Sequence, residues 1–223
     1  MALLDRWLFI WRCCATLVAI VVILGSTGSI GKNTLALCEK FNVEVEALSC
    51  AKNVDLLNEQ ILKFKPKFVC VGDEKLAKNV KNIEAKNIFS GEDGLLEMLE
   101  ILSSKKVINA LVGFAGLAPS LKTQALGKKL ALANKESLVV GGKFLKTREI
   151  LSIDSEHFGL KFLLENKTTP SKLIITASGG AFYKKPIKFL KDATPSDALK
   201  HPNWDMGAKI TIDSATMTNK LFE

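Results

Sequence analysis

The chain has 223 residues, of which 48% are hydrophobic and 24% charged, a composition that fits a soluble α/β protein with its own core. The net charge is +8, but the 31 basic residues are spread along the chain, and one Tyr and three Trp offer little base stacking, so we expect no nucleic-acid partner. The five cysteines are odd in number and lack C-x-x-C spacing, which argues against a disulfide framework or a zinc site and favours reduced thiols in the cytoplasm.

Residues 1–18 are predicted to form an atypical N-terminal extension. The stretch from Trp7 to Leu24 is apolar except for Arg12 and Thr16, which leaves a signal anchor open. Residues 19–24, however, run directly into a glycine-rich turn, as a buried parallel strand does. Because a strand in a sheet cannot also cross a bilayer, we do not expect this segment to span a membrane.

Residues 19–150 alternate between strand and helix patterns. Strands are predicted over 19–24, 43–48, 68–71, 87–89, 107–112 and 130–133, and helices over 30–40, 54–64, 73–80, 92–102 and 117–127. This βαβ alternation predicts an α/β fold with a doubly wound parallel sheet, that is, a Rossmann-like domain for a dinucleotide.

The pattern changes near residue 150, where we place a domain boundary. We predict a helix over 141–148, strands over 150–153, 173–177 and 210–212, a loop-rich stretch over 184–203, and a helix starting near Ser214. Residues 151–223 are therefore expected to be the first part of an incomplete α+β catalytic domain.

The turn Gly25-Ser-Thr-Gly28-Ser-Ile-Gly31 lies between the first strand and the first helix. Glycines permit a tight turn, and the helix N-terminus offers free N–H groups to a pyrophosphate, so this context predicts a dinucleotide site. The second strand is followed by Lys52 and Asn53 in place of an acidic residue, which favours the 2′-phosphate of NADP. A solvated loop lysine is the alternative.

Two polar motifs follow strands. Lys135 lies between Asn134 and Glu136 after the strand 130–133, where a cation could reach a substrate oxygen; a helix-capping Asn beside a surface Lys–Glu pair is the alternative. Asp154 and Glu156 follow the strand 150–153, and on an extended segment they would share one side. Two adjacent carboxylates repel unless a cation joins them, which indicates Mg²⁺ or Mn²⁺, although an exposed strand end would also explain them.

Candidate phosphate ligands occur in two later segments. Ser178 precedes two glycines, and Ser214 could cap a helix whose end binds phosphate. Asn219, Lys220 and Glu223 lie within one helical turn and can share a face. The segment from His201 to Gly207 contains Trp204 and suits a lid over the substrate, or else a packed surface loop.

Together these motifs resemble the 1-deoxy-D-xylulose 5-phosphate reductoisomerase family. The strings LGSTGSIG, AKN, ANKESLV, DSEH, SGG, HPNWDMG and KITIDSATMTNK occur in the family's order over residues 19–223. The resemblance implies NADPH-dependent isomerisation and reduction of 1-deoxy-D-xylulose 5-phosphate to 2-C-methyl-D-erythritol 4-phosphate, with Mg²⁺, Mn²⁺ or Co²⁺, in non-mevalonate isoprenoid biosynthesis.

The resemblance also implies residue roles. Asp154, Glu156 and Glu223 would be the metal ligands and, with Lys135 and His201, the catalytic residues. Cofactor contacts would be Thr27, Gly28, Ser29, Ile30, Ala51, Lys52, Asn53, Asn134, Glu136 and Gly207. Substrate contacts would be Lys135, Ser155, Glu156, Ser178, His201, Trp204, Ser214, Asn219, Lys220 and Glu223, with the phosphate near Ser178, His201, Ser214, Asn219 and Lys220.

The resemblance further implies that family members continue beyond Glu223, so we expect this chain to be C-terminally truncated. A homodimer is expected for the full-length family member and not for the fragment. Two alternatives stay open: a non-catalytic NADPH-binding fragment, and a homoserine dehydrogenase-like reductase. The strings HPNW and SATMTNK argue against the second, because a homoserine site needs no phosphate pocket or lid.

Overall fold

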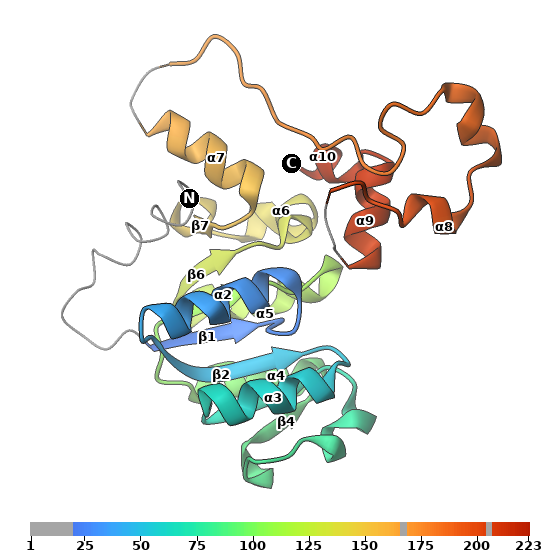
Figure 1. Cartoon of the computed structure of the whole chain (residues 1–223). Helices are drawn as coiled ribbons and strands as arrows, with labels where there is room; N and C mark the ends of the chain where they lie inside the picture. The colour runs from blue at the N-terminus through green and yellow to red at the C-terminus, as the bar shows by residue number, and fades with distance from the viewer. Residues whose placement is uncertain (1–19, 166–168, 204–206) are drawn as a thin grey trace.

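The computed structural model describes residues 20–165, 169–203 and 207–223 (Figure 1). The expectations for residues 1–18 and for Trp204 fall outside these described residues. In the part of the chain that is described, no helix is both long enough and apolar enough to cross a bilayer.

A seven-stranded parallel sheet forms the centre of the molecule, with the strand order β4-β3-β2-β1-β5-β6-β7. This order confirms the predicted doubly wound α/β fold, and every strand expected up to residue 153 is found within a few residues of its expected bounds. The strands are β1 (Ile20–Leu24), β2 (Glu44–Cys50), β3 (Phe68–Val71), β4 (Ile88–Ser90), β5 (Lys106–Asn109), β6 (Lys129–Leu132) and β7 (Leu151–Ser152).

Helices cover both faces of the sheet. The helices α2 (Ser29–Lys40) and α3 (Val54–Phe64) lie on one face, and α4 (Gly91–Ile101) and α5 (Leu117–Ala125) lie on the other (Figure 1). Alternation along β1 builds both cores, because Val21 and Ile23 pack with α2 and α3 while Val22 and Leu24 pack with α4. Short 3₁₀ helices connect these elements: η1 (Glu74–Asn79), η2 (Ala85–Asn87), η3 (Gly113–Gly116), η4 (Gly142–Phe144) and η5 (Thr147–Glu149).

The strand order reverses direction between β1 and β5. From β1 the chain proceeds outward through β2, β3 and β4, and it then returns to place β5 on the other side of β1. In open sheets of this kind, ligands bind at the carboxyl ends of the strands beside such a reversal. The glycine-rich turn follows β1 at this point, and its Gly25 lies against the backbone of Ala110, which follows β5.

The later part of the chain consists of helices and irregular segments: α6 (Lys135–Gly141), α7 (Ser155–Leu164), η6 (Ile187–Asp192), α8 (Pro195–Ala198), α9 (Ala208–Ala215) and α10 (Thr218–Phe222). The predicted helix 141–148 is wrong in position, since the helix begins at Lys135, directly after the capping residue Asn134. The chain end and α10 lie beside α6 and α7 (Figure 1).

Two predicted strands and one helix start are also wrong. Residues 173–177 have no regular structure, and Ile174 is exposed, because no neighbouring strand pairs with them. Residues 210–212 lie inside α9, where Lys209 and Asp213 form an ion pair at helical spacing. Ser214 consequently lies in the last turn of α9 and does not start a helix.

Candidate functional site

The glycine-rich turn is held by close backbone packing. Gly25 has φ +80°, and a Cβ there would lie 2.7 Å from the carbonyl oxygen of Ala110. A Cβ on Gly31 would overlap the backbone of Gly25 and lie 2.5 Å from the Cα of Ser26. Both positions therefore require glycine, and α2 begins immediately against the end of β1.

Polar contacts from β2 and α3 brace the same turn. The Gly25 amide donates to Ser49 Oγ at 3.0 Å, and the buried Ser26 hydroxyl donates to Gln60 Oε1 at 2.6 Å. Gln60 Nε2 donates in return to the Ser26 carbonyl at 3.0 Å. Gln60 was not singled out from the sequence, because a glutamine within a helical pattern carries no signal of a partner 34 residues away.

The first turn of α2 is open to an anion. No side chain in the described residues caps this helix, and its first turn holds no acidic residue. Its N-terminal amides and the positive end of its dipole therefore suit a phosphate group. Gly28 and Ser29 are exposed there, while Thr27 and Ile30 are half-buried.

The end of β2 presents a cation beside the turn. Ala51, Lys52 and Asn53 are all exposed. The side chain of Asn53 caps α3 by accepting a hydrogen bond from the Leu56 amide at 3.2 Å. Lys52 thus follows the carboxyl end of β2, on the side of the sheet where the glycine-rich turn follows β1.

Asn134 makes structural hydrogen bonds through its side-chain amide. Its buried amide group donates to the carbonyls of Leu111 and Gly113 at 2.8 and 2.7 Å, and its Oδ1 accepts from the Ser137 amide at 2.9 Å. The side chain thereby joins the loop after β5 to the start of α6 and fills its hydrogen-bonding capacity within the protein. This arrangement orients the next two residues, Lys135 and Glu136.

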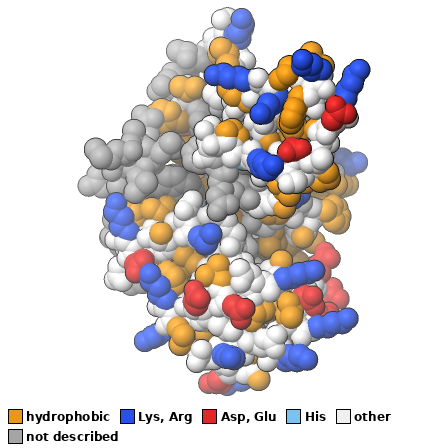
Figure 2. Space-filling model, turned by 45° about the vertical axis from the view of Figure 1, so that its right-hand side comes forward, with side chains coloured by type: hydrophobic (Ala, Val, Ile, Leu, Met, Phe, Trp, Pro, Cys, Tyr) orange, Lys and Arg blue, Asp and Glu red, His pale blue; other side chains and the backbone are white. Residues whose placement is uncertain are grey.

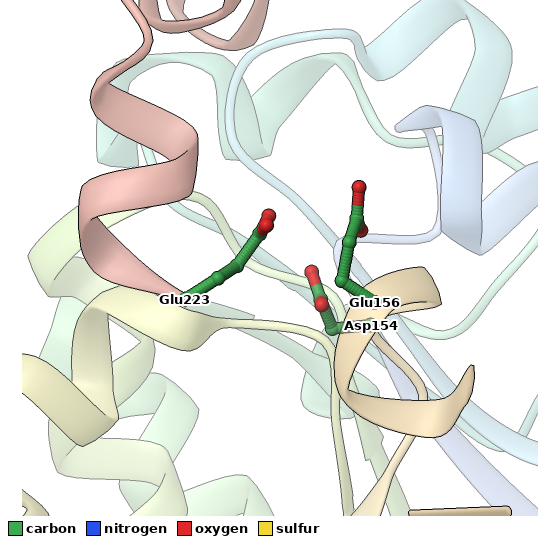
Figure 3. Close-up of side chains that lie close together, drawn as sticks. All are labelled: Asp154, Glu156 and Glu223. Carbon is green, nitrogen blue, oxygen red and sulfur yellow. The ribbon is translucent and has the colours of Figure 1, made fainter. Parts of the chain in front are cut away.

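Three carboxylates converge where β7, α7 and α10 meet (Figure 3). Asp154, Glu156 and Glu223 each offer an oxygen, and these atoms lie within 4.8 Å of one another. The extended segment predicted for the first two is wrong. Asp154 is the N-cap of α7, accepting from the His157 amide at 3.2 Å, and Glu156 lies in the first helical turn. The cap and the first turn still place both carboxylates at one helix end.

Two lysines neutralise most of this charge. Lys135 Nζ lies 3.4 Å from Asp154 Oδ2 and also pairs with Glu223, while Lys220 pairs with both Glu156 and Glu223. The Glu223 side chain is only 1% exposed. With three carboxylates facing two ammonium groups, the cluster keeps an excess negative charge that suits a divalent cation.

Ionic contacts shift the pKa values of Glu156 and Lys135. Burial is the largest single influence and would raise the pKa of Glu156, but the hydrogen bonds from Lys220 and Ser155 and the charge of Lys220 together hold that pKa below its ordinary value. Burial would lower the pKa of Lys135, yet the hydrogen bond to Glu223 and the charge of Asp154 raise it above its ordinary value. Glu156 is therefore a carboxylate near neutral pH.

A second polar cluster is built from the residues predicted to bind phosphate. Ser178 Oγ lies 3.0 Å from His201 Nε2 and 3.5 Å from Ser214 Oγ. Gly180 has φ +65° and packs directly against the backbone at the end of α9, which holds the Ser178 segment beside Ser214. The cluster offers hydroxyl and imidazole donors, and Ser214 contributes from the end of α9 and not from a helix start.

The other predicted substrate contacts lie elsewhere. The side chain of Asn219 is buried and donates to the Ile210 carbonyl at 3.1 Å, which joins α10 to α9. Lys220 contacts the carboxylates, and the Ser155 hydroxyl bonds to Glu156. Gly207 immediately precedes α9, and its carbonyl accepts from the Thr211 hydroxyl at 3.0 Å.

Sequence reasoning missed Lys209. It pairs with Glu136 of α6 and lies 2.7 Å from Asp213 of its own helix. The spacing of Lys209 and Asp213 is a helical signal, but it was obscured by the alternating pattern of residues 210–212, which resembles a strand.

Comparison with known proteins agrees with this geometry. The family model described as 1-deoxy-D-xylulose 5-phosphate reductoisomerase matches residues 21–142, and the model of its C-terminal domain matches residues 150–223. Curated relatives of that name from Campylobacter curvus and Campylobacter hominis are 73% and 68% identical to this chain over 203 residues. Each match covers 91% of this chain and 56% of the relative, so the chain spans little more than half the length of these relatives.

Solved structures give the same result. A DOX-P reductoisomerase in complex with NADPH, fosmidomycin and magnesium has a TM-score of 0.77 and 36% identity, covering 92% of this chain and 56% of that one. A 1-deoxy-D-xylulose 5-phosphate reductoisomerase from Zymomonas mobilis in complex with NADPH has a TM-score of 0.74 and 34% identity over the same shares of the two chains.

Proposed function

This chain belongs to the 1-deoxy-D-xylulose 5-phosphate reductoisomerase family, and we propose that it carries the cofactor, metal and phosphate sites of that reaction. The reaction is the NADPH- and metal-dependent isomerisation and reduction of 1-deoxy-D-xylulose 5-phosphate to 2-C-methyl-D-erythritol 4-phosphate. One observation supports the proposal above all others: the side-chain oxygens of Asp154, Glu156 and Glu223 lie within 4.8 Å of one another. Two of these residues lie 67 or more positions from the third, so only the fold brings the set together.

The carboxylate cluster fits Mg²⁺ or Mn²⁺. Three carboxylate oxygen donors without a cysteine are the chemistry that these hard cations prefer. Bound there, the ion would supply Lewis-acid polarisation of the carbonyl and hydroxyl oxygens of the substrate. Lys135 and Lys220, which border the cluster, place two ammonium groups where they can bind substrate oxygens.

The glycine-rich turn fits the pyrophosphate of NADPH, which would supply the hydride. The open amides at the start of α2 would bind the pyrophosphate, and Lys52 would bind the 2′-phosphate. Ser178, His201 and Ser214 would donate hydrogen bonds to the phosphate of the substrate. Anchoring this remote phosphate contributes binding energy that orients the reacting carbons toward the metal and the cofactor.

The test is an assay of metal- and substrate-dependent NADPH oxidation. The oxidation is measured as the loss of NADPH absorbance. The assay is run with Mn²⁺ on this chain and on a version extended to the full length of the relatives, each beside its Asp154→Asn variant. If either chain oxidises NADPH and its Asp154→Asn variant does not, the proposal is supported for that chain. An extended chain that folds and binds NADPH but does not turn over would refute the reaction and leave the second candidate, a dinucleotide-binding protein without this activity.

We also propose that the protein works in the cytoplasm. Cys38, Cys50 and Cys70 are free and buried. Burial raises the pKa of Cys38 and Cys70 to about 12 and that of Cys50 to about 11, so all three are protonated thiols at neutral pH. Unpaired thiols packed in a core are typical of proteins that stay in a reducing compartment.

A further inference from the structure

Three ion-pair links join the segment 207–223 to α6 and to the start of α7. Lys135 pairs with Glu223, and Lys220 pairs with Glu156. Both of these links use a candidate metal ligand. In the third, Lys209 of α9 pairs with Glu136 of α6, and neither residue belongs to the carboxylate cluster.

Lys209 holds several elements with one ammonium group. Besides Glu136, it contacts Asp213 Oδ2 at 2.7 Å, one turn further along α9, and its Nζ lies 5.3 Å from the ring centroid of Phe222, the last residue of α10. The side chains of Glu136 and Asp213 are 14% and 15% exposed and that of Lys209 is 42% exposed, so the two carboxylates are shielded from water while the lysine is partly hydrated. Burial would lower the pKa of Lys209, but the hydrogen bonds to Asp213 and Glu136 raise it above its ordinary value.

The three links respond differently to a cation at the carboxylates. A divalent ion competes with Lys135 and Lys220 for the same oxygens, so those two links weaken as the ion binds. The link through Lys209 shares no oxygen with that site and persists in both states. Glu223 follows α10 directly and is carried by it, so its position depends on how α9 and α10 are held on α6.

We propose that Lys209 is a positioning residue: its link to Glu136 holds α9 and α10 on α6, and so keeps Glu223 beside Asp154 and Glu156 with and without a cation. The proposal rests on the metal site of the proposed function. Lys209 lies outside the carboxylate cluster, and it acts through the placement of Glu223.

The first test is Mn²⁺ affinity, measured by titration with detection of free Mn²⁺ by electron paramagnetic resonance, without NADPH. Lys209→Met and Glu136→Gln should each weaken binding about tenfold, as loss of an outer positioning contact does. The double variant should bind no more weakly than either single variant, because both changes break one link. Lys209→Arg, which keeps the charge, should restore most of the affinity.

The matched control is Lys63→Met. Lys63 pairs with Glu39 at 2.8 Å between α3 and α2, in an exposed position away from the cluster. This variant should leave Mn²⁺ affinity unchanged. Unchanged affinity in both Lys209→Met and Glu136→Gln, or losses that add in the double variant, would overturn the proposal.

The second test needs no metal. Amide hydrogen exchange over residues 208–222 is measured in the metal-free chain, where Lys209→Met and Glu136→Gln should speed exchange and Lys63→Met should not. Adding saturating Mn²⁺ should not remove the difference. If Asp154→Asn does not weaken Mn²⁺ binding by the unaltered chain, or if that chain binds no Mn²⁺, the proposed metal site is refuted. The exchange result without metal still decides for or against the link between Lys209 and Glu136.

Discussion

Asp154 has two roles that a pair of substitutions can separate. Its Oδ1 caps α7, and its carboxylate is one of three oxygen donors in the cluster. Asparagine caps a helix about as well as aspartate, whereas alanine does not, at a cost of about 1 kcal/mol. Asp154→Asn therefore removes the charge and keeps the helix start, and Asp154→Ala removes both.

The expected magnitude follows from the geometry. Loss of an outer partner of a metal ligand costs about 10–100-fold in affinity, so loss of a direct ligand should cost at least about 100-fold. In the unaltered chain, metal at about 100 times its Kd should stabilise the fold by about 2.7 kcal/mol, or roughly 5–11 °C in Tm. At the same Mn²⁺ concentration, Asp154→Asn should keep at most about 0.4 kcal/mol of this increase.

The assay is thermal unfolding with and without Mn²⁺, beside direct Mn²⁺ titration. Without metal, Asp154→Asn should melt close to the unaltered chain, because it keeps the cap and leaves a cluster in which two carboxylates face two ammonium groups. Asp154→Ala should melt roughly 2–4 °C lower. An Asp154→Asn variant with the Mn²⁺ affinity of the unaltered chain would refute the assignment of this cluster as the metal site.

Other substitutions test the turn and the core. Gly31→Ala forces a Cβ into the backbone of Gly25 and should destabilise the fold by about 1–3 kcal/mol in chemical denaturation. Gly28→Ala, whose Cβ would lie 3.4 Å from the nearest atom, should leave stability nearly unchanged but weaken NADPH binding measured by fluorescence titration; equal stability losses in the two variants would contradict this account of the turn. Glu46 is 2% exposed and accepts three hydrogen bonds: from the amide and the hydroxyl of Ser103 at 3.0 and 2.6 Å, and from the Ser104 amide at 2.7 Å. Glu46→Gln should therefore lower the free energy of unfolding by about 2–4 kcal/mol at neutral pH. Burial by itself would raise the pKa of Glu46, but these hydrogen bonds together outweigh burial and hold the pKa below its ordinary value of 4.5. The ionised Glu46 therefore stabilises the fold fully above pH 4.5, and this stabilisation is lost as the pH falls through the folded-state pKa. The stability gap between Glu46→Gln and the unaltered chain should therefore narrow in acid, and a gap that is constant with pH would argue against an ionised Glu46.

Lys135 and Lys220 affect the metal affinity that these titrations measure. Lys135 and Lys220 occupy the oxygens that a cation would take, so the measured metal affinity is net of breaking their ion pairs. High salt weakens exposed ion pairs most, and these lysines are only 13% and 19% exposed, so their competition should persist at physiological ionic strength.

Charged side chains of both signs share one face of the molecule (Figure 2). Lys and Arg side chains are scattered over the face in view and interleaved with Asp and Glu, without a continuous stripe (Figure 2). Pairs such as Lys63 with Glu39 and Lys86 with Glu84 are exposed surface contacts of the kind that contribute little to stability.

The sequence by itself determined the parts of this protein that depend on local pattern. Apolar runs followed by glycine or polar residues located the parallel strands, and the 3.6-residue period located α3 at its observed bounds. The glycine turn was recognisable because Gly25 and Gly31 meet steric demands from nearby backbone. Asp154 and Glu156 were predicted to share one cation because neighbouring carboxylates repel, and the structure places them together, although the strand assigned to them was wrong.

Only the tertiary structure decided how distant side chains combine. Glu46 and Ser103 are 57 positions apart, and Lys209 and Glu136 are 73 apart, so no periodicity in the chain announces either contact. The same limit explains the error over residues 210–212: an alternating Ile-Thr-Ile run forms a strand only if another strand is there to pair with it. No strand lies beside it in the described part of the fold, and the ion pair between Lys209 and Asp213 stabilises a helix instead. Pairing partners and burial are properties of the folded chain, which is why they override local preference.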